Sequence, residues 1–180
     1  ITYTLKKHDL EVCWEVVNND SETMYFTIGG HPAFRVPVRE GESQSDYRLA
    51  FEGLDTLTYL LIDTSVGTVL ADEPHTLSLE NGTCSIAPHM FDKDALVFDN
   101  GQIQKAGILF PDGTPYLTLT SEGFPNFGIW SVPGAPFVCL EPWMGRCDDC
   151  GFEKPLSEKA NINVLKPDEE FIKSYQITIH

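Results

Sequence analysis

Short runs in which apolar and polar positions alternate recur along most of the chain. In residues 10–17, every second position is Leu, Val, Trp or Val, and two glutamates lie between them. A two-residue period is that of a half-buried β-strand, because successive side chains point to opposite faces. The 3.6-residue period of an amphipathic helix is nearly absent, and only residues 88–94 are candidates for a turn or two of helix. The pattern therefore predicts an all-β fold.

Turn residues separate these runs at the spacing of antiparallel strands. The Pro-Asp-Gly sequence at 111–113 predicts one hairpin, and the Asn-Asn-Asp-Ser sequence at 18–21 predicts another between residues 10–17 and 24–28. Roughly a dozen short strands at this spacing are typical of a β-sandwich or barrel. No repeat and no Pro/Gly/Ser-rich linker divides the sequence, so we expect a single β-sandwich domain over residues 1–180.

The composition is acidic and excludes some classes of partner. The 180 residues include 27 Asp and Glu against 12 Lys and Arg, which gives a formal net charge of -15. This charge repels nucleic-acid phosphates and anionic lipid surfaces, so we expect no nucleic-acid or membrane partner. A hydrophobic share of 42% is that of a globular chain rather than a disordered one.

The five cysteines are scattered, which does not fit a small disulfide-stabilised protein. Cys147 and Cys150 form a lone Cys-x-x-Cys. It lacks the second ligand pair of a structural zinc site and the βαβ context of a thioredoxin-like redox pair, so we interpret both as incidental thiols. This cysteine usage favours a reducing, cytoplasmic location, and no apolar run is long enough to span a bilayer.

Two candidate proton-transfer residues each stand directly before a proline. His31 lies in the Gly-Gly-His-Pro-Ala-Phe segment at 29–34, and Glu141 lies in Leu-Glu-Pro-Trp at 140–143. The residue before a proline is held in extended backbone, so both belong at strand ends or on stiff loops. Histidine exchanges protons near neutral pH, and a carboxylate that ends an apolar run becomes a better base through desolvation. The alternatives are a structural histidine bonded to a backbone carbonyl and a glutamate in an ion pair, with Arg146 as its partner.

Other candidate groups have simpler interpretations beside the functional one. Asp92, Asp94 and Asp99 cluster in a segment whose aspartates are explained as turn and cap residues, while Asp94 is also suited to bind sugar-like hydroxyls. The segment lacks the pattern of a calcium loop, and we find no metal-binding motif. Four aromatic residues near these candidates are interpreted either as core or as an apolar platform for a sugar ring: Phe34, Phe91, Trp130 and Trp143.

Taken together, these segments resemble the aldose 1-epimerase (galactose mutarotase) family, and within it the bacterial LacX-like branch. The resemblance rests on Gly-Gly-His-Pro-Ala-Phe at 29–34, Phe-Asp-Lys-Asp-Ala-Leu-Val-Phe at 91–98, and the stretch at 128–149 that contains Gly-Ile-Trp-Ser and Cys-Leu-Glu-Pro-Trp-Met-Gly-Arg-Cys-Asp-Asp. The closing stretch, from Glu158 to Ile177, is also similar to the end of that branch. The resemblance extends over essentially the whole chain.

The resemblance implies a large antiparallel β-supersandwich and a cofactor-independent isomerase that interconverts the α and β anomers of a free aldose such as galactose or glucose. By it, Glu141 matches the general base that takes the proton of the anomeric hydroxyl. His31 matches the general acid that protonates the ring oxygen, with the sugar ring between the two groups. Asp94 matches a hydroxyl-binding acid, and Phe34 and Trp143 are expected to contact the substrate.

The sequence departs from this family pattern in one respect. A His-Gly-Phe-Ala-Arg-like motif, which in the family lies in a longer N-terminal portion and lines the pocket, is not found here. The chain also starts at Ile1, inside a strand-like pattern. We therefore expect it to be the C-terminal part of a longer family member, without some N-terminal strands of the full fold.

Two other functions are compatible with the same residues. One is a non-catalytic carbohydrate-binding or sugar-sensing protein that keeps the fold. The other is a structural β module in which His31 and Glu141 are unrelated, and a wide separation of those two side chains would favour it. The sequence does not specify the sugar, its anomer, the use of phosphosugars or the oligomeric state.

Overall fold

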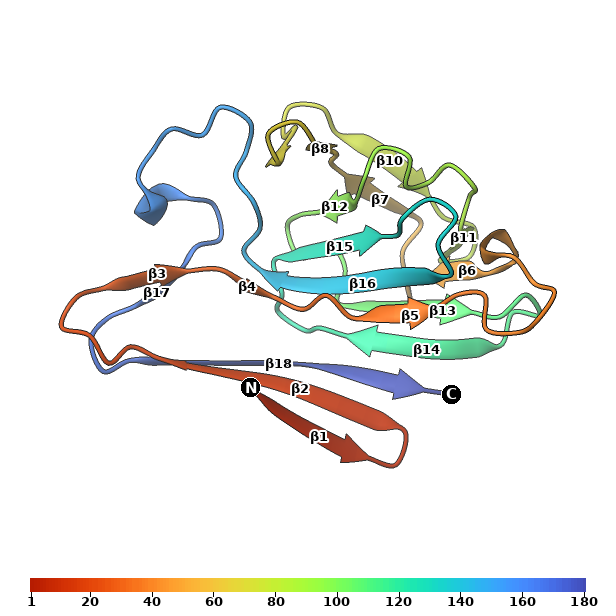
Figure 1. Ribbon diagram of the computed structural model, residues 1–180, viewed down its shortest axis with the longest axis horizontal. Coiled ribbons are helices and arrows are strands. Elements are labelled where there is room, and N and C mark those ends of the chain that lie inside the picture. Colours follow the sequence, from red (N-terminus) through yellow and green to blue (C-terminus); the bar gives the residue numbers. More distant parts are fainter.

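The computed structural model describes all of residues 1–180, and its regular secondary structure is almost entirely antiparallel β-strand, as the alternating pattern predicted (Figure 1). The larger of its two main sheets has seven strands, which run in the spatial order β1 (Thr2–Lys6), β2 (Asp9–Val17), β18 (Glu170–Ile179), β14 (Pro115–Thr120), β13 (Lys105–Leu109), β6 (Arg48–Ala50) and β11 (Thr83–Ser85). The β1–β2 hairpin and β18, from opposite ends of the chain, lie side by side along one edge of the molecule.

The second main sheet has five strands and carries the residues of interest. Its order is β12 (Leu96–Phe98), β15 (Asn126–Trp130), β16 (Phe137–Met144) and β4 (Ile28–Gly29), and β5 (Ala33–Arg35) also pairs with β16. Three two-stranded sheets complete the strands: β7 (Thr56–Tyr59) with β10 (His75–Ser78), β3 (Met24–Phe26) with β17 (Asn163–Leu165), and β8 (Ile62–Asp63) with β9 (Thr68–Val69).

Helical structure is limited to two short 3₁₀ turns, η1 (Gln44–Asp46) and η2 (Leu156–Glu158). The helix candidate at 88–94 is a series of hydrogen-bonded turns instead, closed by bonds such as that from the Asp94 N–H to the Phe91 carbonyl. No helix has the length and apolar character needed to cross a membrane.

The main hydrophobic core unites inward-facing side chains of the two large sheets. The seven-stranded sheet contributes residues such as Val12 of β2 and Leu119 of β14 to this core. The five-stranded sheet contributes residues such as Phe98 of β12 and Leu140 of β16. Alternation along each strand directs these residues inward and their neighbours outward, and burial of the apolar side chains stabilises the layered arrangement. One face of the five-stranded sheet therefore packs in the core, and its other face is available for a ligand-binding site.

The hairpin predictions had mixed outcomes. The turn at 111–113 joins β13 and β14 as a hairpin, which confirms the prediction. The hairpin predicted across 18–21 is wrong, because β2 pairs with β1 and β18 while β3 pairs with β17. The buried Asn18 explains the difference: its side-chain amide donates to the carbonyls of Glu22 and Leu165, so this turn is held against a distant segment rather than folded back on itself.

Candidate functional site

His31 and Glu141 occupy facing positions on neighbouring strands. Gly29 of β4 lies opposite Trp143 of β16, and Ala33 of β5 lies opposite Cys139. The two pairings share one antiparallel register, so the residue midway between Gly29 and Ala33, which is His31, falls opposite Glu141. The structure therefore brings together the two residues that the sequence analysis selected, although 110 positions separate them.

The two prolines explain why the pairing is interrupted at this point. The Gly30 N–H donates to the Pro142 carbonyl at 3.0 Å, and the Leu140 N–H donates to the Pro32 carbonyl at 3.3 Å. In each pair the return bond is missing because proline has no N–H. His31 and Glu141 form the pair between these bonds, where opposed side chains approach each other most closely in an antiparallel sheet. The two proline-containing motifs thus position their proton-transfer residues against each other.

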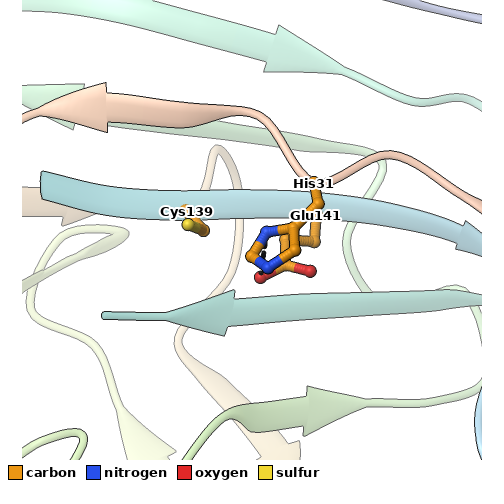
Figure 2. A group of neighbouring side chains, drawn as sticks. All are labelled: His31, Cys139 and Glu141. Atoms are coloured by element: carbon orange, nitrogen blue, oxygen red, sulfur yellow. Dashed lines mark ion pairs between the residues drawn. The ribbon is translucent and has the colours of Figure 1, made fainter. Parts of the chain in front are cut away.

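The two side chains are in contact and differ greatly in exposure. His31 Nδ1 lies 3.0 Å from Glu141 Oε1, and the side-chain exposures are 60% for His31 and 7% for Glu141. Figure 2 shows the imidazole lying against the carboxyl group. The imidazole also packs edge-on against the Trp130 indole, with 5.6 Å between ring centroids. A buried carboxyl is therefore covered by a solvent-accessible imidazole, which is an arrangement suited to proton exchange with a ligand.

Alternation along β16 separates core residues from site residues. Val138 and Leu140 point into the main core. Cys139, Glu141 and Trp143 occupy the intervening positions and therefore share the opposite face. On that face, polar atoms of His31, Cys139 and Glu141 all lie within 4.8 Å of one another.

The environment of Glu141 changes its acidity. Burial raises the pKa of its carboxyl to about 7, the nearby charge of Asp94 also raises it, and a polar contact with the Trp143 side chain opposes the rise. Desolvation has this effect because it penalises the charged form of an acid. A carboxyl whose pKa lies near neutral pH is suited to act as a general base.

Trp143 lies flat on the sheet because two neighbouring strands carry glycine beneath it. A β-carbon at Gly29 of β4 or at Gly128 of β15 would overlap the indole ring. Gly128 is also the residue opposite Glu141 in the β15–β16 register. The two glycines therefore allow a large aromatic surface to lie beside the buried carboxyl.

The other predicted site residues are placed differently. Asp94 lies close enough for its charge to raise the pKa of Glu141. Its backbone is in the left-handed region at φ 72°, and its carboxylate accepts a bond from the Ala95 N–H at 2.6 Å. Phe34 lies opposite Val138 and packs against the main core, so it does not join the others on the face of Glu141. Strand alternation is the physical reason, because three positions separate Phe34 from His31 and direct it to the other face.

A cavity of about 400 Å³ adjoins the pair and gives a ligand access to it. His31, Glu141 and Trp143 line it, together with Arg146 and Cys147 from the segment after β16. Arg146 is not the partner of Glu141 that the sequence analysis considered. Its guanidinium instead binds Asp99, with Nη2 2.7 Å from Oδ2. All five cysteines are free thiols, and Cys150 is exposed.

Sequence reasoning missed Cys139 as a site residue. Cys139 lies in an apolar run, which by itself favours a core position, and its side chain is buried. The signal that would have located it is its spacing of two from Glu141, because strand alternation puts both on one face.

Comparisons with known proteins agree with this fold and these motifs. No family model matches the chain. The LacX proteins of Lactococcus lactis subsp. lactis, one plasmid-encoded and one chromosomal, are 30% identical to it over 99% of its length. The chain spans 60% of the length of these relatives.

Two solved structures extend the similarity. A galactose mutarotase-related enzyme from Lactobacillus acidophilus superposes with a TM-score of 0.88 at 28% identity, over 99% of this chain and 59% of that one. A galactose mutarotase-like protein from Lactobacillus casei gives a TM-score of 0.82 at 26% identity, over 99% and 61% of the two chains. The resemblance seen in the sequence is confirmed: the chain is related over its length to LacX and the galactose mutarotase-related proteins, and it has their fold.

Proposed function

We propose that this protein interconverts the α and β anomers of a free aldose, with Glu141 as the general base and His31 as the general acid. The observation that carries the proposal is the buried Glu141 carboxyl, with a pKa raised to about 7, in contact with an exposed imidazole at the wall of an open cavity. The similarity to a galactose mutarotase-related enzyme supports the choice of reaction.

The contact between His31 and Glu141 determines which of their atoms can reach a sugar and from which side the sugar approaches. With Nδ1 of His31 turned to Oε1 of Glu141, the opposite ring nitrogen, Nε2, is left for the substrate. A separation of 3.0 Å leaves no room for a sugar ring between the groups, contrary to the arrangement expected from the resemblance. The ring must approach from the cavity instead. Its anomeric hydroxyl and ring oxygen are bonded to the same carbon, so adjacent acid and base atoms can reach both.

The proposed reaction balances without a further reactant. Glu141 takes the proton of the anomeric hydroxyl, whose oxygen forms a carbonyl bond to C1. The bond from C1 to the ring oxygen breaks, and its electron pair takes a proton from His31. Rotation about the C1–C2 bond presents the other face of the aldehyde, and both proton transfers then reverse to close the ring as the other anomer. General acid–base catalysis of this kind contributes about 10²- to 10⁴-fold to a rate.

Two further residues have proposed binding roles. The Trp143 indole, flat beside Glu141, provides an apolar surface of the kind on which a sugar ring packs. The second carboxylate oxygen of Asp94 is suited to accept a hydrogen bond from a sugar hydroxyl, while the first holds the Ala95 N–H. We propose that both orient the substrate and that neither transfers protons.

Saturation-transfer NMR of anomer exchange in glucose and galactose tests the proposal. Exchange is expected to be faster with the protein than in buffer. Glu141→Gln is expected to lower this acceleration about 1,000-fold, since it removes the base but keeps the shape of the side chain. Glu153→Gln, the same change at an exposed position, is the matched control and is expected to retain the full rate.

The same experiment separates the alternatives. Sugar binding without faster exchange would contradict catalysis and support a sugar-binding protein. Equal rates for Glu141→Gln and the unaltered protein would exclude Glu141 as the base.

A further inference from the structure

The face of β16 that carries Glu141 also presents a set of metal-ligand atoms. Cys139 and Glu141 are two positions apart on this strand, and His31 faces them from the connection between β4 and β5 (Figure 2). One ring nitrogen, one sulfur and one carboxylate oxygen lie within 4.8 Å of one another. No acid–base step proposed above uses the sulfur.

We propose that His31, Cys139 and Glu141 form a binding site for a divalent ion of borderline softness, of which Zn²⁺ is the model. Imidazole, thiolate and carboxylate are the three ligand types that zinc takes from proteins. Mg²⁺ and Ca²⁺ prefer oxygen ligands, so one sulfur and one nitrogen among three donors select against them.

The spacing of the donors is close to that of a tetrahedral site. Zinc-bound nitrogen and oxygen atoms about 2.0–2.2 Å from the metal are roughly 3.3 Å from each other, and His31 Nδ1 and Glu141 Oε1 are already 3.0 Å apart. Cys139 Sγ lies within 4.8 Å of a ring nitrogen of His31 and of a carboxylate oxygen of Glu141, and its side chain must move closer to complete a three-ligand face. The exposed side of His31 gives the ion a route of entry, and a water molecule would take the fourth position.

Metal binding has a defined proton balance. The Cys139 thiol loses its proton to solvent as its sulfur bonds to the ion, and the imidazole and carboxylate bind in their unprotonated forms. Cys139 is a free cysteine, and an ordinary thiol is protonated at neutral pH, so this proton is present before the ion binds. Each ion bound therefore releases at least one proton, which can be measured in weakly buffered solution.

Occupancy of this site excludes the acid–base chemistry of the same residues. An ion bound between His31 Nδ1 and Glu141 Oε1 lowers the basicity of the carboxylate that would take the anomeric proton. We therefore expect Zn²⁺ to inhibit anomer exchange in proportion to occupancy and a chelator to restore it. This inhibition rests on the proposed function, whereas metal binding itself does not.

Titration with Co²⁺, followed by competition with Zn²⁺, tests the binding site. One equivalent of Co²⁺ is expected to give a sulfur-to-cobalt charge-transfer band that Zn²⁺ removes. Cys139→Ser is expected to abolish the band and to weaken Zn²⁺ binding on the order of 100-fold, since even indirect ligand partners are worth 10- to 100-fold. Cys150→Ser, which removes an exposed thiol, is the matched control and keeps the band.

His31→Ala provides a second variant in case Cys139→Ser fails to fold, because the His31 side chain is mostly exposed. It is expected to weaken Zn²⁺ binding to a similar extent. No charge-transfer band, or a band that persists in Cys139→Ser, would overturn the metal site. Zn²⁺ bound at these residues with unchanged anomer exchange would overturn the inhibitory role alone. If the protein does not accelerate anomer exchange at all, the Co²⁺ spectrum still decides the metal site.

Discussion

Two carboxylates associated with the five-stranded sheet, those of Asp99 and Glu141, differ in their burial and in the charge of their partners. Asp99, directly after β12, receives bonds from the Arg146 guanidinium at 2.9 and 2.7 Å and from the Asn126 amide at 2.7 Å. Glu141, within β16, is more deeply buried, and its ion-pair partner is the exposed imidazole of His31. Asp99 therefore has a fixed cation, while Glu141 has a partner whose charge depends on protonation.

This difference separates a structural carboxylate from a chemically usable one. Burial by itself lowers the pKa of the Arg146 guanidinium, but its bonds to Asp99 and Asp149 outweigh this effect and raise the pKa. Arg146 thus remains charged, and its bonds to Asp99 hold the segment after β16 against the end of β12. Glu141 lacks such a cation, so desolvation raises its pKa into the range where it can gain and lose a proton.

The largest expected effect concerns the structural pair. Arg146→Met leaves Asp99 and Asp149 close together without their shared cation. We expect it to lower the free energy of unfolding by about 3 kcal/mol, because removal of one partner leaves an uncompensated, largely buried charge. Urea denaturation measures the change. Lys154→Met removes an exposed ion pair with Glu158 and is the control, for which almost no change is expected.

Glu141→Gln is expected to have the opposite effect on stability. The pKa of Glu141 is about 7 in the folded protein against an ordinary value of 4.5, so the folded state binds more protons between these pH values. The stability of the unaltered protein therefore falls as the pH rises through this window, while glutamine does not titrate. At pH 8 the variant is expected to be more stable by about 2 kcal/mol.

The control for this prediction is the same pair of proteins at pH 4.5, where the difference should nearly vanish. Urea denaturation at both pH values measures it. A Glu141→Gln protein that is less stable at pH 8 would show that the His31 contact outweighs desolvation, and the contrast with Asp99 would then fail.

The smallest expected effect concerns the contribution of Asp94 to the raised pKa of Glu141. Asp94→Asn removes a negative charge that raises the Glu141 pKa, so that pKa is expected to fall only slightly, because burial is the larger cause of the rise. Carbon-13 NMR titration of the Glu141 carboxyl measures the shift directly. Asp92→Asn, in the same turn segment, is the control. An unchanged titration in Asp94→Asn would leave burial as the sole cause of the raised pKa.

Local sequence patterns were sufficient for the strands and for the choice of His31 and Glu141. Alternation along residues 10–17 and the apolar run at 137–140 are properties of neighbouring residues, and each proline restricts the residue before it. These effects act over one or two positions, so they can be read without knowledge of the fold. The turn at 18–21 shows their limit, because its strands pair with distant partners instead of each other.

Only the tertiary structure decided which residues share the site. Strand register placed His31 opposite Glu141, brought Cys139 beside them, and turned Phe34 toward the core. The tertiary structure also pairs the Arg146 guanidinium with the Asp99 carboxylate rather than with that of Glu141. The physical reason is that pairing between strands far apart in sequence depends on the packing of two whole sheets. The sequence by itself determined that a histidine and a glutamate would stand in rigid, extended backbone, and the fold determined that they would meet.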